Sequence, residues 1–574
     1  MSTEDPSSPR VVIIGLDGAT FDLILPWIKT GKLPSIAKVL DSSSYGPLSS
    51  THPPSTFPAW TTFMTGKNPG KHGIYDFTQH KEDVYGIQFV NSTFRKGKTL
   101  WQLLSECGKR VGVLGLPATY PPEPINGFLI SGFDSPVTTG IDSSFTYPRE
   151  LYGELKKKLG PYTITDFQEL RIGKGWHEDA LDKILSTLER KAAYANYLLK
   201  KESWDCFMVL FGESDTVSHH FWMFHDQKSP RYDPKASARL QNAILTVYRK
   251  LDEVIGDLIT TLPEDTCIIL LSDHGFGGAG DKVIYLNRWL EQKGYLSFKG
   301  TGNLFHKTLN WSKKAALQVL PSNIQEQFFR RGSGRVASTI ESLSRFGHIN
   351  WGCTQAFSEE LNYFPNIWIN LKGREPQGMV EPGRTYELLR EEIIEKLSGF
   401  TNSDTNEKIV HRAYKREELY QGDQLEKAPD IILELNCDQG YSYSLLPSRL
   451  ESGKEILRTL RKDELMGAKG KSMNGSHRME GILTMKGPSI LKGKKLEGLS
   501  LKDLTPTILH LLNCPLPSDL DGQVIENAFE KDFLKSHPIR YNKTGESNQD
   551  SPPQDLTAAE EASLRERLKD MGYF

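Results

Sequence analysis

Four short runs of apolar, largely β-branched residues recur along this chain, each bounded by polar residues. They are VVIIGL at 11–16, VGVLGL at 111–116, DCFMVLF at 205–211 and TCIILLS at 266–272, with helical patterns such as 98–108 and 178–201 between them. A strand buried on both faces of a parallel sheet shows this continuous apolar pattern. Because such strands alternate with helices, we predict an α/β fold with a doubly wound, mainly parallel sheet.

The chain is longer than one hydrophobic core usually organises, since it has 574 residues. Between 279 and 470 the pattern loosens into mixed helices and short strands, which predicts an inserted α+β cap. A strand pattern resumes at 481–485, and 502–513 reads as an amphipathic helix. We therefore expect a discontinuous core unit, made of residues 1–278 and 471–541.

The C-terminal region indicates a linker followed by a helix. Residues 542–555 are polar and contain prolines, which is typical of a linker. In the tail, 556–574, a helix is predicted from Leu556 to Met571, with Thr557 as its N-cap and Glu560 completing a capping box.

Charge and cysteine content limit the possible partners. The 70 basic and 72 acidic residues nearly cancel and form no basic run, so no nucleic acid polymer is expected. The six cysteines are scattered singly, as in a protein whose thiols stay reduced. No window approaches the ~20 apolar residues of a spanning helix, so we expect a cytoplasmic protein. The sequence gives no indication of an oligomeric state.

Several acidic and histidine residues follow the ends of the predicted strands, where open α/β sheets bind their ligands. They are Asp17, the pair Asp215 and His219, the pair Asp273 and His274, and later His477. Taken singly, each has an ordinary interpretation. Asp17 with Gly18 could form only a turn, Asp215 and His219 could be an i,i+4 pair on a helix, and His477 could be an exposed polar residue. Together they favour a metal site, and the carboxylate and imidazole ligands suit zinc best, with manganese fitting almost as well.

Segments across most of the chain resemble the type I phosphodiesterase/nucleotide pyrophosphatase family of the alkaline phosphatase superfamily. Asp17 is similar to the first-strand aspartate of that family. The nucleophile segment is matched by Pro54-Ser55-Thr56-Phe57-Pro58 leading into Thr65-Gly66 and His72-Gly73-Ile74, and the later motifs by Asp215 to His219, Ser272-Asp273-His274-Gly275 and Gly475-Ser476-His477.

The resemblance implies an alkaline-phosphatase-like fold and a site with two divalent metal ions. Asp215, His219 and His477 would hold one ion. Asp17, Asp273 and His274 would hold the other, with the oxygen of Thr56, the nucleophile, as a further ligand. Metal coordination activates a threonine hydroxyl and neutralises charge on the phosphoryl oxygens. We therefore expect a hydrolase that acts on a small phosphoester, with a phosphodiester preferred, through a phosphothreonine intermediate.

The chain departs from the family directly after the nucleophile. Nucleotide pyrophosphatases carry Asn-His where this sequence has Ala59-Trp60, so the asparagine donor to the phosphoryl oxygen is missing. The metals, the backbone N–H of Phe57 or a group from the cap would have to replace it. Candidate substrate contacts are Phe57, Trp60, Arg374 and Arg478. Trp60 could instead be a core residue, and the two arginines could be solvated side chains. For His72, we expect a structural hydrogen bond and no metal contact.

Alternative functions remain open on the same scaffold. One is a phosphomonoesterase or phospho-group transferase, and another is a non-catalytic metal-binding scaffold. A sulfatase would need a C/S-x-P-x-R motif, but residues 56–60 are TFPAW. A metal-dependent phosphoglycerate mutase would use serine in place of Thr56.

Overall fold

The computed structural model describes residues 9–135, 143–164, 175–299, 345–448, 453–465 and 473–542, together with 556, 557, 560, 561 and 564. The other residues include most of the predicted linker and tail helix, which therefore lie outside the described residues.

The main sheet has nine strands in the order β20-β2-β19-β9-β1-β8-β5-β6-β7. Its centre is parallel and contains the four predicted runs, as β1 (Val11–Leu16), β5 (Val111–Leu116), β8 (Cys206–Phe211) and β9 (Cys267–Leu271), with β6 (Gly127–Ser131) beside β5. Antiparallel pairs join β19 (Glu480–Lys486) to β9 and to β2 (Ser44–Ser49), and join β7 (Thr146–Tyr147) to β6. At the far edge, β20 (Leu499–Ser500) runs parallel to β2. The mainly parallel α/β sheet is thus confirmed.

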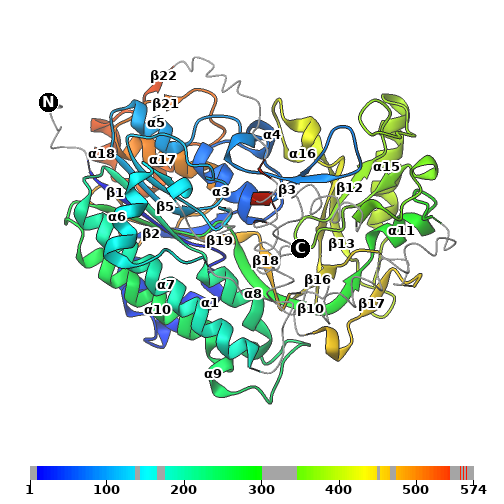
Figure 1. Ribbon diagram of the computed structural model, residues 1–574, viewed down its shortest axis with the longest axis horizontal. Coiled ribbons are helices and arrows are strands. Elements are labelled where there is room, and N and C mark those ends of the chain that lie inside the picture. Colours follow the sequence, from blue (N-terminus) through cyan, green and yellow to red (C-terminus); the bar gives the residue numbers. More distant parts are fainter. Residues whose placement is uncertain are drawn as a thin grey trace.

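Helices cover both faces of this sheet (Figure 1). Val12, Ile14 and Leu16 of β1 enter one hydrophobic cluster, whereas Val11 and Ile13 enter another on the opposite face. The first cluster includes residues of α1 (Phe21–Lys29), α2 (Pro34–Asp41), α7 (Trp176–Lys201) and α10 (Ala243–Thr260), and the second includes residues of α3 (Thr56–Thr65), α5 (Leu100–Glu106) and α17 (Leu504–Leu511). None of the helices in the described ranges is long and apolar enough to cross a membrane.

The three central strands end together. Leu16 of β1 pairs with Phe211 of β8, and Gly15 pairs with Leu271 of β9. The residues that follow these strands therefore meet at one edge of the sheet. The predicted site residues come from this edge.

The cap has its own hydrophobic cluster, built largely from residues 284–445. It contains a sheet in the order β11-β12-β14-β13, with bounds Ala356–Phe357, Asn366–Ile369, Ile431–Leu435 and Val410–Lys415, and α15 (Arg384–Ser398). Strand β10 (Gly275–Ile284) leaves the main sheet region and enters a second cap sheet with β15 (Cys437–Asp438), β16 (Tyr441–Leu445) and β17 (Leu457–Thr459) (Figure 1). The expected boundary at 278/279 therefore falls inside β10.

One hairpin from the first core segment also packs on the cap. It consists of β3 (Thr78–His80) and β4 (Ile87–Phe89), and Tyr85 at its turn stacks on Trp351 with ring centroids 3.5 Å apart. The interface between core and cap thus involves more of the chain than the predicted boundaries imply.

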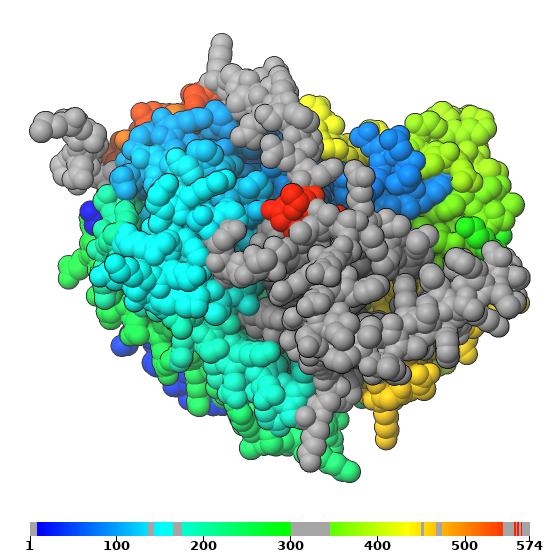
Figure 2. Space-filling view, viewed as in Figure 1, coloured from blue at the N-terminus to red at the C-terminus, as the bar shows by residue number. Residues whose placement is uncertain are grey.

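The described tail residues dock against the core unit. Thr557 and Glu560 form the predicted capping box, in which the Thr557 backbone N–H donates to the Glu560 carboxylate (2.8 Å). Tyr120 donates its hydroxyl to Glu560 (2.6 Å), and Leu564 is 1% exposed in the hydrophobic cluster that contains Phe57. The described tail residues as a group form the red patch in Figure 2. Asn542, expected to open the linker, instead ends β22 (Tyr541–Asn542), which pairs with β21 (Leu516–Pro517).

Candidate metal centre

Asp17 lies in a turn that only glycine can complete. Gly18 has φ +64°, and a Cβ atom at this position would lie 2.9 Å from Phe276 and 3.1 Å from the Asp215 carboxylate. Its N–H donates to Asp273 Oδ1 (3.2 Å). The Asp17-Gly18 pair is therefore a turn, and it also brings Asp17 and Asp273 to the same edge of the sheet.

The first turns of α8 (Glu213–His225) carry Asp215 and His219 on one face. Asp215 Oδ1 lies 3.3 Å from His219 Nε2, and Ser214 donates its hydroxyl to the Asp17 carbonyl (2.7 Å). The i,i+4 spacing seen in the sequence thus does occur on a helix. Its two side chains also meet residues from other strand ends.

His274 and His477 are brought together by an antiparallel pair. Phe276 of β10 is in register with His477 of β18 (Gly475–Arg478), and the rings of His274 and His477 stack with centroids 3.7 Å apart. His274 Nε2 lies 3.3 Å from Asp273 Oδ2 and 3.6 Å from Asp17 Oδ1. His477 Nε2 lies 3.4 Å from Asp215 Oδ1.

These side chains form two overlapping groups of candidate metal ligands. One consists of Asp215, His219 and His477, as the family resemblance implied. The other consists of Asp17, Asp215 and His274, so Asp215 belongs to both groups. Asp273, which was expected in the second group, lies beside it against His274.

Each histidine turns Nε2 toward the carboxylates. Nδ1 faces a backbone carbonyl oxygen in all three: Gly475 for His219 (3.2 Å), Gly275 for His274 (3.0 Å) and Pro54 for His477 (2.8 Å). Since a carbonyl oxygen only accepts, Nδ1 is the donor in each ring, and Nε2 is the nitrogen that faces the carboxylates. Metal-ligating histidines are held in this way by groups behind them.

The buried carboxylates of the cluster favour the binding of a cation. Burial, together with the negative charges of Asp273 and Asp215, raises the pKa of Asp17 well above its usual value, and burial raises the pKa of Asp273 to about 8. Burial and His274 lower the pKa of His477 to about 3, so its ring is neutral, yet its Nε2 lies 3.0 Å from His219 Nε2. Buried carboxylates are unfavourable unless a cation balances them.

Unpartnered atoms support the same conclusion. Among the described residues, Asp17 Oδ1, Asp273 Oδ2 and His274 Nε2 are buried and have no hydrogen-bond partner. Buried polar atoms are normally satisfied, and an ion is one explanation when they are not. These residues therefore fit divalent metal ions.

Thr56 is the first residue of α3 and is fully buried. Hydrogen bonds tie the chain on both sides of it to the cluster. His477 donates to the Pro54 carbonyl, and the Trp60 indole N–H donates to Asp17 Oδ2 (3.1 Å). The nucleophile candidate and the metal ligands thus form one connected unit.

The four predicted substrate contacts are placed differently from expectation. Trp60 is fully buried in the core below the sheet edge, so it orients Asp17 and offers no stacking platform. Arg374 forms a two-pronged pair with Asp430 (2.8 and 2.6 Å), and Arg478 donates to the carbonyls of Gly278 and Gly440 (3.1 and 3.2 Å). The Phe57 side chain is buried against Phe77, which leaves only its backbone to face a substrate.

Other histidines near the motifs have structural roles. His72 accepts from the Ile74 N–H at Nδ1 (3.2 Å), so its Nε2–H donates to the Thr62 hydroxyl (3.0 Å), as the structural interpretation expected. His220 packs on Trp176, and His225 packs on Trp27 and Trp222. Among the neighbouring histidines of α8, His219 is thus the one that joins the metal groups.

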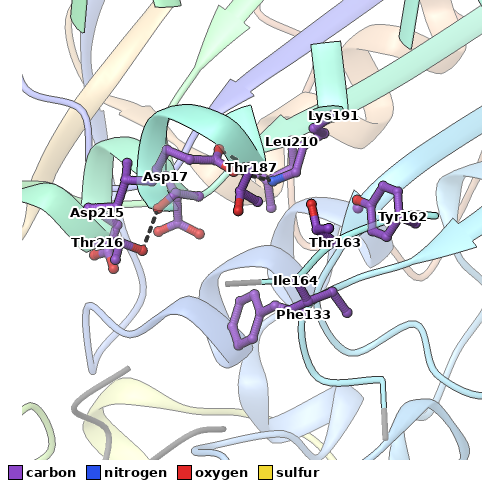
Figure 3. A pocket seen from close by; sticks show the side chains of 14 residues that line it. Asp17, Phe133, Tyr162, Thr163, Ile164, Thr187, Lys191, Leu210, Asp215 and Thr216 are labelled. Atoms are coloured by element: carbon purple, nitrogen blue, oxygen red, sulfur yellow. Dashed lines mark hydrogen bonds and ion pairs between the residues drawn. The ribbon is translucent and has the colours of Figure 1, made fainter. Parts of the chain in front are cut away.

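A pocket opens beside the carboxylates of Asp17 and Asp215. Figure 3 shows Asp17 and Asp215 at one side and Phe133, Tyr162 and Ile164 at the other. Thr163, Thr187 and Lys191 add polar groups, but Lys191 already pairs with Glu213 at 3.0 Å. The pocket is therefore partly apolar, and the charge of Lys191 is balanced.

Sequence reasoning missed Tyr363, which reaches the cluster from the cap. Its ring stacks on His477, with centroids 4.2 Å apart and 9° between planes, and its hydroxyl oxygen lies 3.2 Å from His219 Nδ1. Residue 363 lies 144 positions after His219, in a segment without a recognisable motif. No local signal was available to find it.

Comparisons with known proteins show which family model matches the chain. The family model described as "Type I phosphodiesterase / nucleotide pyrophosphatase" matches residues 11–447, a stretch that contains every predicted ligand except His477. A search of curated proteins found no match.

Similar solved structures include ectonucleotide pyrophosphatase/phosphodiesterase 5 from mouse (14% identity, 91% of this chain and 100% of that chain covered, TM-score 0.46) and from human (14%, 92% and 99%, 0.45). Another is phosphonoacetate hydrolase from Sinorhizobium meliloti 1021 in complex with phosphonoacetate. It has 14% identity and a TM-score of 0.48, and the match covers 88% of this chain and 96% of that chain.

Proposed function

Because the chain belongs to the type I phosphodiesterase/nucleotide pyrophosphatase family, of the alkaline phosphatase superfamily, we propose that it is a phosphodiesterase that uses two divalent metal ions and Thr56 as nucleophile. The enzyme is a metal-dependent hydrolase of small phosphoesters. The proposal of two metal ions rests on the two ligand groups that share Asp215. Two adjacent groups with a common carboxylate suit two neighbouring ions.

Thr56 would perform the first chemical step. Its Oγ1 forms a bond to phosphorus while the ester oxygen of the leaving group departs, and the second ester arm stays on phosphorus. Water then attacks this phosphothreonine intermediate, which frees Thr56 and releases a phosphomonoester. Bound metal ions would lower the pKa of the hydroxyl and balance charge on the phosphoryl oxygens. The carboxylates and imidazoles of the two groups would hold them.

The first turn of α3 would supply part of the missing oxyanion donor. Ala59 is fully buried and has no polar side-chain atom. The N–H groups in the first turn of an α-helix lack intrahelical acceptors, and the helix dipole there favours an anion. The N–H of Phe57, the second residue of α3, is therefore the backbone donor we assign to the phosphoryl oxygen.

The pocket beside Asp17 and Asp215 favours a diester over a monoester. A diester needs room and apolar surface for its second arm, and Phe133, Ile164 and Tyr162 provide such a surface. A monoester would gain from additional cations around the terminal phosphate, but Lys191 is paired with Glu213. Zinc is the ion that carboxylate and imidazole ligands favour, with manganese as the alternative.

A substrate panel tests this proposal. Protein reconstituted with Zn²⁺ or Mn²⁺ should hydrolyse bis(p-nitrophenyl) phosphate with a kcat/KM at least about tenfold above that for p-nitrophenyl phosphate, because an apolar arm in a fitting pocket contributes about 1–3 kcal/mol. Inorganic pyrophosphate completes the panel, and metal-stripped protein is the control. A preference for the monoester in both metal forms would instead assign the chain as a phosphomonoesterase or phospho-group transferase.

A further inference from the structure

Tyr363 is a cap residue whose side chain contacts two of the candidate metal ligands. Its ring lies flat on His477 and its hydroxyl oxygen shares the Nδ1–H of His219 with the Gly475 carbonyl. The contact with His219 is made at Nδ1, whereas Nε2 of the same ring faces the Asp215 carboxylate, and the contact with His477 is made on the ring face. A side chain in this position can fix the orientation of both rings.

The loop that carries Tyr363 is anchored on its N-terminal side. Asn287 bonds Ser358 twice, since its side chain donates to the Ser358 carbonyl (2.9 Å) and accepts from the Ser358 N–H (2.8 Å). The buried Glu360 accepts from the Asn287 N–H (2.9 Å) and from the Ser448 hydroxyl (2.6 Å). Three residues before Tyr363, the chain is therefore held at a fixed position in the cap.

Further anchors lie directly before and directly after Tyr363. Asn362 accepts from the Leu445 N–H (3.0 Å), and Phe364 is buried in a cluster with Tyr75 and Tyr420. Glu360 also has φ +54°, a left-handed conformation that is costly for a residue with a long side chain. A strained and multiply anchored loop is typical of a segment whose shape serves a site.

From this geometry we propose that Tyr363 is a positioning residue through which the cap sets the orientation of His219 and His477 in their metal group. The inference rests on the proposed function for the identity of the metal centre. It assigns to the cap a role in metal binding that is separate from any contact with substrate. Loss of the ring removes the stacking contact on one face of His477, and loss of the hydroxyl alone removes a contact with His219.

Two variants separate the ring from the hydroxyl. Tyr363→Ala removes both, and Tyr363→Phe keeps the stacking on His477. Tyr285→Phe is the matched control, because Tyr285 is a buried cap tyrosine whose hydroxyl accepts from Arg458 (3.0 Å). Melting temperatures establish that each variant is folded.

Zinc affinity is measured by competition with a chelator, and ligand geometry by the visible absorption of the Co²⁺-loaded protein. Tyr363→Ala should weaken zinc binding by about 10–100-fold and alter the Co²⁺ spectrum, as loss of a group behind a ligating histidine does. Tyr363→Phe should recover most of the affinity, and Tyr285→Phe should equal wild type. Unchanged affinity and spectrum in Tyr363→Ala would overturn the inference.

These readouts need no substrate. An inactive wild type in the diester panel would contradict the proposed function, yet the metal affinities of the Tyr363 variants would still decide the positioning role. Where the wild type is active, Tyr363→Ala should lower kcat more than it raises KM at saturating zinc, because the cap tyrosine acts through the ligands. An effect confined to KM would count against the positioning role.

Discussion

Replacing Thr56 with alanine should lower kcat/KM for the diester by at least about 10⁴-fold, as loss of a nucleophile does in other enzymes with covalent intermediates. The side chain is buried at the start of α3, between the contacts that Pro54 and Trp60 make with the cluster. Alanine keeps those contacts but leaves no oxygen to attack phosphorus. Metal content should therefore stay at the wild-type level, as elemental analysis can establish.

Thr61→Ala is the matched control for this experiment. Thr61 is equally buried on the same helix, and its hydroxyl has no hydrogen-bond partner among the described residues. Its loss should leave turnover near the wild-type rate. Near wild-type activity of metal-loaded Thr56→Ala would show that another group is the nucleophile.

Asp215→Asn should have the second large effect, because Asp215 belongs to both ligand groups. Asparagine keeps the size of the side chain but removes the charge that both groups share. Loss of groups behind metal ligands already costs about 10–100-fold in metal affinity, so loss of a shared ligand should weaken binding by at least about 100-fold. Metal retained after dialysis and activity should fall together.

Asp252→Asn serves as the control for burial and charge. Asp252 is a buried aspartate that accepts from the backbone N–H groups of Ser35 (3.0 Å) and Ile36 (2.7 Å), away from the cluster. This variant should lose stability but keep its metal. If Asp215→Asn bound metal as tightly as wild type, the shared-ligand assignment would be wrong.

The central sheet could be predicted because its strands are buried on both faces and so leave a continuous apolar pattern. Strand β1 matches the predicted 11–16, and β8 and β9 differ from expectation only at their ends. Strands β2 (SYGPLS) and β10 (GFGGAGDKVI) were not predicted, because their sequences are polar or rich in glycine. Their pairing depends on partners far along the chain, which no local pattern reveals.

The gathering of the candidate ligands could also be predicted, since each of them follows a strand end or lies in a short motif. The sharing of Asp215 between groups was not, because it depends on how α8 packs on the sheet edge. The ion pair of Arg374 could not be predicted, because its partner Asp430 comes 56 residues later. Tyr363 was missed for the same reason. The cytoplasmic location stays a prediction.

The most direct test of the account is to identify the residue that carries phosphorus during turnover. Wild-type protein turning over bis(p-nitrophenyl) phosphate would be quenched rapidly in acid, and its peptides analysed by mass spectrometry. The account predicts a p-nitrophenyl phosphoryl group on Thr56 that is absent from Thr56→Ala. A phosphoryl group on a different residue, or an initial burst of nitrophenol from the Thr56→Ala variant, would contradict it.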